Sequence, residues 1–186
     1  MSKIFLLRHL KSQWNLEDRF AGWTDGPIAK KESAKALDMA KEIFQNKIDA
    51  VYTSSLFRNH DTVARIFEAV DEKYPFFIHL DPGKMQDWGN FEDISENDVP
   101  AYVSEKLNER YYGKLQGLNK AEITKKYGAP MVHAWRRGFT LAPPGGESEK
   151  DVYERAIPFF KKYIEKDLKM EKIFWWLLVI TVCGQL

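Results

Sequence analysis

The sequence predicts an α/β fold, a three-layer sandwich in which helices flank a mostly parallel central sheet. Short apolar runs of strand length alternate with segments whose apolar residues recur at helical spacing, and this alternation is typical of parallel sheets. The chain has 186 residues, which is the size of one domain with a core of its own. We therefore expect a single domain that covers residues 1–186.

The first expected strand covers residues 3–7. Because its residues are apolar in succession, we expect it to be central in the sheet and buried on both faces. Leu37, Ala40 and Phe44 then recur at a spacing that predicts a helix with one apolar face.

The second expected strand covers residues 48–53. The segment 56–70 follows with helical spacing, and Ser54 or Ser55 is placed to cap that helix. A third strand is expected at residues 76–80. These elements continue the strand–helix alternation of the fold class.

The middle of the chain has a different character. Residues 81–147 are polar and show little periodicity, which predicts an inserted lid or cap over the carboxyl end of the sheet. Their end, residues 141–148, is a turn-rich connector. Ser148 can cap a following helix, which Pro158 should bend. A last strand is expected at residues 173–180.

Composition excludes several classes of partner. Lys plus Arg number 28 and Asp plus Glu number 27, so the whole molecule has no electrostatic attraction to nucleic acid or to an anionic membrane. The single cysteine, Cys183, allows neither an intramolecular disulfide nor a cysteine metal cluster. The apolar run at 173–183 is shorter than the roughly 20 residues of a membrane helix. We expect a cytoplasmic protein.

Three side chains suggest a phosphoryl site. Arg8 and His9 follow the first strand, and Arg58 opens the helix after the second strand. The carboxyl ends of parallel strands share one edge, where ligands bind, and a helix amino terminus there adds N–H donors for an anion. A neutral imidazole can attack phosphorus while guanidinium groups neutralise the oxygen charge.

The middle segment adds further candidates. Glu109 is a candidate proton carrier, although a solvated surface is the commoner role for such residues. The candidate anion binders are Arg110, Lys120, Arg136 and Arg137. We interpret His60, His79 and His133 as surface or core histidines.

Five stretches of the chain together resemble one family. They read "LLRHLKSQWN", "DRFAGWTD", "YTSSLFRN", "LNERYYGKLQGLNKAEITKKYG" and "WRRGFTLAPPGGES". The chain resembles the cofactor-dependent phosphoglycerate mutases of the histidine phosphatase superfamily. The resemblance implies the fold of those enzymes and transfer of a phosphoryl group between the 3- and 2-hydroxyls of glycerate. It also implies priming by 2,3-bisphosphoglycerate, a small phosphorylated substrate and no metal, and it leaves a homo-oligomer open.

The resemblance also implies roles for single residues. His9 corresponds to the histidine that becomes phosphorylated, and Glu109 to the proton donor and acceptor. The implied phosphate and substrate contacts are Arg8, Ser12, Asn15, Ala21, Gly22, Arg58, Arg110, Tyr111, Tyr112, Lys120, Arg136 and Arg137.

Two departures from the family pattern stand out. Leu10 replaces the glycine of Arg-His-Gly, and a leucine in left-handed backbone geometry costs about 1–2 kcal/mol. We therefore expect strain at residue 10, or crowding of the phosphate. Residues 173–186 read "IFWWLLVITVCGQL" where the family continues into a second histidine, and we expect a truncated or frameshifted end.

These departures leave three interpretations open. The protein is an active mutase, or a degenerate member that binds phosphorylated ligands with little or no turnover, or a non-catalytic interaction protein. The retained charged residues favour the first two interpretations over the third. Leu10 and the missing second histidine favour the second over the first.

Overall fold

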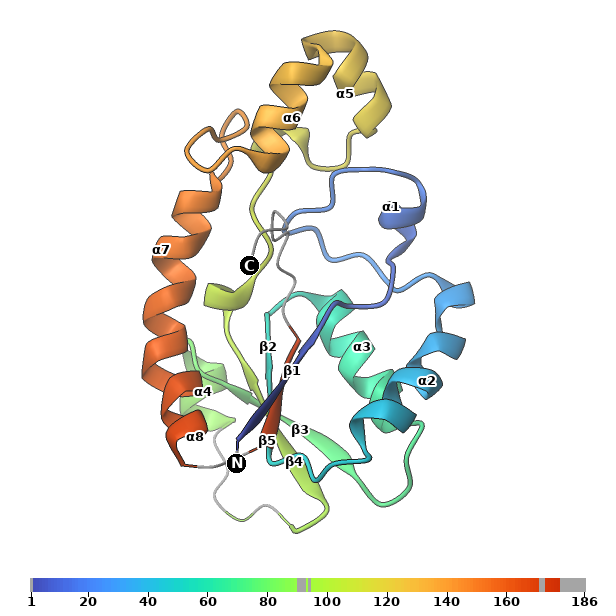
Figure 1. Ribbon diagram of the computed structural model, residues 1–186, viewed down its shortest axis with the longest axis vertical. Helices are drawn as coiled ribbons and strands as arrows, with labels where there is room; N and C mark the ends of the chain where they lie inside the picture. Colours follow the sequence, from blue (N-terminus) through green and yellow to red (C-terminus); the bar gives the residue numbers. More distant parts are fainter. Residues whose placement is uncertain (1, 90–92, 94, 171–172, 178–186) are drawn as a thin grey trace.

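A parallel sheet with helices on both faces organises the protein, as the computed structural model in Figure 1 shows. The structure describes residues 2–89, 93, 95–170 and 173–177. Within them, the sheet has the strand order β1-β5-β2-β4-β3, and every pair is parallel. This confirms the predicted α/β class. The strands are β1 Lys3–Leu7, β2 Ala50–Thr53, β3 Tyr74–His79, β4 Asp98–Val103 and β5 Ile173–Leu177.

The helices form the outer layers. In Figure 1, α2 and α3 lie on one side of the sheet, α7 and α8 lie on the other, and α5 and α6 stand beyond the upper end. The α-helices are α1 Gln13–Leu16, α2 Ala34–Ile43, α3 Phe57–Phe67, α4 Lys84–Trp88, α5 Lys120–Tyr127, α6 Ala129–Arg137, α7 Glu149–Phe159 and α8 Glu165–Lys169. Shorter turns are the 3₁₀ helices η1 Lys30–Glu32, η2 Glu105–Leu107 and η3 Gly113–Leu115, and the π-helical η4 Phe160–Ile164.

The strand register aligns the carboxyl ends at one edge. Thr53 of β2 pairs with Val103 of β4 and with Leu177 of β5. Leu177 also pairs with Leu7 of β1, and Val103 pairs with His79 of β3. The segments that follow these strands therefore start side by side, and they carry the candidate site residues.

Three apolar clusters hold the layers together. Buried residues of β2 and β4 pack with Val63 and Ile66 on the α2–α3 side. Tyr52 packs with Phe159 and Ile164 on the α7 side. The third cluster belongs to the α5–α6 end and contains Phe20, Tyr112, Leu115, Ile123, Val132 and Trp135.

The predicted position of the first strand is wrong. In the described sheet, β1 pairs with β5 and has no second neighbour. Ile4 and Leu6 are accordingly 37% and 57% exposed. The reason is that β5 lies between β1 and β2 and takes the position expected for β1. An apolar run indicates a strand, but it does not indicate the strand's place in the sheet order. The predicted extension to residue 180 lies outside the described residues.

Sequence analysis also missed a strand. β4 lies between β2 and β3, within the segment predicted as a lid. Its residues Val99, Ala101 and Val103 are buried, while the residues between them are partly exposed. The polar sequence around this short alternation concealed the strand.

The predicted cap of α3 is also wrong. Leu56 occupies the N-cap position, and its side chain makes no capping hydrogen bond. The first-turn Phe57 N–H donates instead to Asp25 Oδ1 at 2.8 Å. Ser54 Oγ accepts from the Leu56 N–H, one residue before the helix. The cap therefore comes from a segment distant in sequence, which local propensity cannot predict.

The helix after the turn-rich connector begins where it was predicted. Ser148 caps α7 in a reciprocal capping box with Asp151. Pro158 lies in the last turn of α7, and the π-helical turn η4 follows directly. Among the described residues, no helix is long and apolar enough to cross a membrane.

Candidate active site

His9 has the hydrogen bonding of a neutral nucleophile. It lies two residues after β1 and is 4% exposed. Its Nδ1 lies 2.5 Å from the backbone oxygen of Leu10. Because a carbonyl can only accept, Nδ1 carries the proton and Nε2 keeps its lone pair. Burial lowers the pKa of His9 to about 3, and the charges of Arg58 and Arg8 act in the same direction.

Leu10 neither strains the backbone nor crowds the site. Its side chain is 4% exposed and belongs to the core cluster on the α2–α3 side, together with Ile28. Apart from glycines, the described residues with positive φ are Asp18 and Glu72. The expected strain and crowding at residue 10 are therefore absent, because the side chain points into the core from ordinary backbone geometry.

A buried hydroxyl connects the His9 loop to α3. The Leu10 N–H donates to Thr62 Oγ1 at 3.1 Å, and this hydroxyl donates to the Arg58 carbonyl at 2.7 Å. Thr62 is fully buried. Leu10, whose carbonyl orients His9, is thus tied through its N–H to the helix that carries Arg58. Sequence analysis missed Thr62, although its position four residues after Arg58 places both on one helix face.

Arg58 is a buried guanidinium whose outer nitrogens are held by protein oxygens. Its Nη2 donates to the Gly22 carbonyl and to Glu109 Oε2, each at 2.8 Å. Its Nη1 donates to the Thr24 carbonyl at 3.1 Å, and its Nε has no hydrogen-bond partner. Gly22 has φ +52°, and a Cβ there would overlap Gln116. Glycine therefore allows this loop to present its carbonyl to Arg58.

Glu109 lies where three guanidinium charges meet. Its side chain is 14% exposed and pairs with Arg58, and the charges of Arg8 and Arg110 also act on it. Burial nevertheless raises the pKa of Glu109, against the opposing pull of these arginines. A carboxyl group with a raised pKa beside a nucleophile's phosphate-binding cations is suited to carry a proton.

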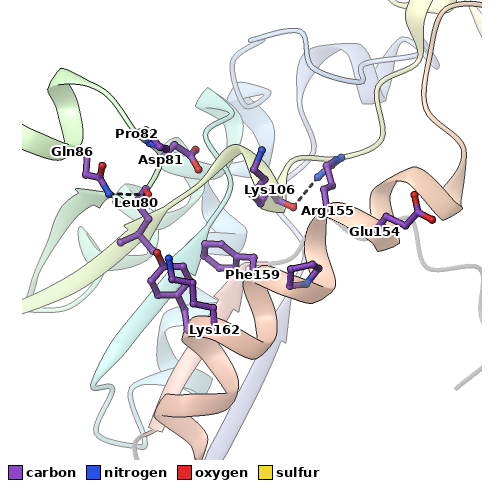
Figure 2. A pocket seen from close by; sticks show the side chains of 11 residues that line it. Leu80, Asp81, Pro82, Gln86, Lys106, Glu154, Arg155, Phe159 and Lys162 are labelled. Carbon is purple, nitrogen blue, oxygen red and sulfur yellow. Dashed lines mark hydrogen bonds between the residues drawn. The ribbon is translucent and has the colours of Figure 1, made fainter.

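The backbone of Glu109 is clamped by two side chains. Its carbonyl accepts from Trp23 Nε1 at 2.6 Å and from Arg155 Nη2 at 3.1 Å. Arg155 comes from α7 and also donates to the carbonyls of Lys106 and Asn108, each at 2.8 Å. Figure 2 shows Arg155 reaching toward Lys106 at the side of a pocket outside the His9 network.

Glu147 completes this clamp from the turn-rich connector. Its carboxylate accepts from Arg155 Nε at 2.8 Å and from the Tyr111 N–H at 2.8 Å. Both ends of the segment that carries Glu109 and Arg110 are therefore fixed. Sequence analysis missed Trp23, Arg155 and Glu147, because their partners are backbone carbonyl and N–H groups of an irregular segment.

Arg110 is 2% exposed and follows Glu109 directly. Its Nη2 donates to the Arg136 carbonyl at 2.6 Å and approaches the Tyr112 hydroxyl at 3.4 Å. Its guanidinium carbon lies 5.2 Å from the centre of the Tyr112 ring. Its Nε and Nη1 have no hydrogen-bond partner. Arg110 also pairs with Glu149, and the positive charge of Arg137 acts to lower the pKa of that carboxyl group.

The remaining predicted contacts occupy local positions around this network. Ser12 and Asn15 form the capping box of α1, which uses the hydroxyl and the amide oxygen. Lys120 pairs with Asp18 at 2.7 Å. Tyr111 is 37% exposed, and Ala21 is buried beside Gly22. Arg8, His9, Arg58, Glu109 and Arg110 thus interact electrostatically with one another. Arg136 contributes its backbone carbonyl, and the exposed Arg137 acts on the network through Glu149.

The other histidines of the sequence lie outside this network. His60 packs against Phe77 with the ring centres 4.9 Å apart, His79 ends β3, and His133 is exposed on α6. Within the described residues, no group of three or more His, Cys, Asp or Glu side chains is placed to hold a metal ion.

Comparison with solved structures defines the class of fold. A mycobacterial glucosyl-3-phosphoglycerate phosphatase complexed with VO3 superposes with a TM-score of 0.69 and 23% sequence identity, covering 93% of this chain and 73% of that chain. The Bacillus stearothermophilus protein YhfR superposes with a TM-score of 0.67 at 23% identity, covering 95% of this chain and 73% of that chain. At these identities, the likeness concerns the fold alone.

Sequence comparison defines the family. Residues 4–99 and 90–180 match the histidine phosphatase superfamily (branch 1). A 2,3-bisphosphoglycerate-dependent phosphoglycerate mutase of Protochlamydia amoebophila is 39% identical over 175 residues, which cover 92% of this chain and 77% of that protein. A protein of the same name from Methanococcus vannielii is 41% identical over 165 residues, covering 88% and 70%. The chain belongs to the histidine phosphatase superfamily.

Proposed function

We propose that this protein is a 2,3-bisphosphoglycerate-dependent phosphoglycerate mutase, which interconverts 3- and 2-phosphoglycerate through a phosphohistidine on His9. The observation that carries the proposal is the state of His9: a buried, neutral imidazole with its Nδ1 proton bound by the Leu10 carbonyl. The names of the relatives that match the chain support the same reaction. A small phosphorylated acid is the substrate, and the cytoplasm is the expected location.

In the proposed reaction, His9 already carries a phosphoryl group on Nε2. A free hydroxyl of the substrate attacks that phosphorus, the N–P bond breaks, and Glu109 accepts the hydroxyl proton. His9 Nε2 then attacks the other phosphorus of the bound acid, and the N–P bond forms as the bond from that phosphorus to oxygen breaks, while Glu109 returns the proton to this oxygen. Arg8 and Arg58 neutralise the charge on the phosphoryl oxygens.

The donor set around His9 fits 2,3-bisphosphoglycerate, which would supply the phosphoryl group that first loads His9. Arg58 Nε and Arg110 Nε and Nη1 are buried donors without a partner. Buried donors of this kind favour a ligand with several anionic oxygens. Arg8, Arg58 and Arg110 would therefore hold the bisphosphate. Assembly into a homo-oligomer stays a prediction.

A degenerate member that binds phosphorylated ligands without turnover is the second candidate. The observation that favours it is the engagement of Arg58 by the carbonyls of Gly22 and Thr24 and by Glu109. A phosphoryl group that binds Arg58 has to replace these oxygens as the hydrogen-bond acceptor. The free energy of binding is therefore less favourable than it would be for an unpaired arginine.

Labelling His9 tests the proposed function. The protein is incubated with 2,3-bisphosphoglycerate carrying radioactive phosphorus, and acid-labile, base-stable label is measured beside turnover of 3-phosphoglycerate in a coupled assay. We expect label and turnover in the wild type, and neither in the His9→Gln variant. The matched control is His133→Gln, because His133 is exposed on α6. Absence of both label and turnover in the wild type would favour the degenerate member, and label without 2-phosphoglycerate would overturn the mutase assignment.

A further inference from the structure

Glu149 and Arg110 form an incomplete ion pair beside the proposed site. Glu149 is the first residue of α7, and its side chain is 19% exposed. Its Oε1 lies 3.2 Å from Arg110 Nη2. The contact lacks hydrogen-bond geometry, and Oε1 is buried without a hydrogen-bond partner. The carboxylate therefore supplies charge to Arg110 without saturating the guanidinium.

Arg110 keeps donors for another anion. Its Nε and Nη1 are buried and have no hydrogen-bond partner, and the side chain is 1% exposed. Unpaired donors of a buried charge are costly, and an anion that reaches them gains strong, charge-assisted hydrogen bonds. The negative charge of Glu149 opposes that anion by repulsion at short range.

The surroundings of Glu149 make its carboxyl group easy to protonate. The facing charged groups are Arg110, Arg137 of α6, and Glu109. Burial raises the pKa of Glu149, the two arginines lower it, and Glu109 raises it further; the net direction is upward. An anion bound at Arg110 would add one more negative charge and favour protonation again.

We propose that the Glu149 carboxylate competes electrostatically with the anionic substrate for Arg110. A phosphorylated acid that reaches the open Nε and Nη1 of Arg110 brings negative charge close to Glu149, and this favours uptake of a proton by the Glu149 carboxylate where it lies. The inference rests on the proposed function for the chemistry of the ligand, but it requires no turnover. It predicts that removing this one negative charge strengthens binding.

Isothermal titration with 3-phosphoglycerate tests the competition. We expect the Glu149→Gln variant to bind about tenfold more tightly than the wild type, which corresponds to about 1.4 kcal/mol. The matched control is Glu154→Gln, which removes the same charge from an exposed position of α7 that pairs with Lys150. The control should bind as the wild type does.

Two further measurements separate competition from a general charge effect. Titrations in buffers with different ionisation enthalpies should show less proton uptake for Glu149→Gln than for the wild type. In an Arg110→Met background, Glu149→Gln should no longer strengthen binding. Equal or weaker binding by Glu149→Gln, or binding by neither protein, would overturn the inference. Label on His9 from 2,3-bisphosphoglycerate decides the proposed function separately.

Discussion

Changing Leu10 to glycine should destabilise the protein and should not speed phosphorylation of His9. The Arg-His-Gly pattern of related sequences suggests that glycine would restore the site. The structure indicates the reverse, because the Leu10 side chain is 4% exposed within the core cluster that contains Ile28 and Val63. Its N–H already donates to Thr62 Oγ1, and its carbonyl accepts from His9 Nδ1.

The expected loss follows from burial and from backbone entropy. Truncating a buried leucine to alanine costs about 2–5 kcal/mol, and glycine adds roughly 0.5–1 kcal/mol through the freedom of the unfolded chain. The sum of about 2.5–6 kcal/mol is a large part of the 5–15 kcal/mol typical of a domain. For a chain of this length, the midpoint of thermal unfolding should fall by roughly 5–24 °C.

Urea unfolding and the rate of His9 phosphorylation are measured on the same preparations. Leu10→Ala separates the side-chain effect from the backbone effect, and Leu10→Met keeps the volume and should cost less than about 1.5 kcal/mol. A Leu10→Gly variant as stable as the wild type that phosphorylates faster would show that strain or crowding at residue 10 does obstruct the site.

Three further predictions concern Thr62, Arg155 and His9. Thr62→Val leaves the buried Leu10 N–H without its acceptor, so it should cost about 1–3 kcal/mol in urea unfolding and slow phosphorylation of His9, whereas Thr62→Ser should restore both; a valine variant as fast as the wild type would contradict this. Arg155→Met should lower kcat by about 10- to 100-fold with little change in KM, and Arg155→Lys should not rescue it, because an ammonium group cannot reach the same carbonyls; a change in KM alone would argue against the clamp. Because the pKa of His9 falls from 6.5 to about 3 on folding, the folded protein binds fewer protons between these values. The contribution of His9 to stability is therefore fully present above pH 6.5 and is lost as the pH falls toward 3. Urea unfolding across this range should be less pH-dependent for His9→Asn, and equal slopes would refute the shift.

The sequence predicts that the site residues lie close together, because several of them directly follow parallel strands whose carboxyl ends share one edge of the sheet. Arg8 and His9 follow β1, Arg58 follows β2, and Glu109 follows β4, whose ends the register aligns. The first three were predicted from that logic. Glu109 came from the family resemblance and from its residue type, because β4 itself was not recognised.

Other parts of the site have no signal in the sequence. Arg155 is one charged residue among many on an amphipathic helix, and its acceptors are the carbonyls of Lys106, Asn108 and Glu109. Every residue has a backbone carbonyl, so no sequence motif indicates which carbonyls accept hydrogen bonds from a given arginine. The error at Leu10 has a related cause, because the direction of its Cβ depends on the local backbone path.

The arginines of the site are held on internal acceptors, and this has a consequence for ligand binding. Arg58 donates to two carbonyls and to Glu109, and Arg110 pairs with Glu149. Binding of a phosphoryl group is then an exchange in which the ligand replaces protein oxygens, and its affinity is the difference between two sets of interactions. Both carboxylates have pKa values raised by burial, so each can leave its arginine by accepting a proton. Affinity for anions should therefore rise as the pH falls and these two carboxylates take up protons.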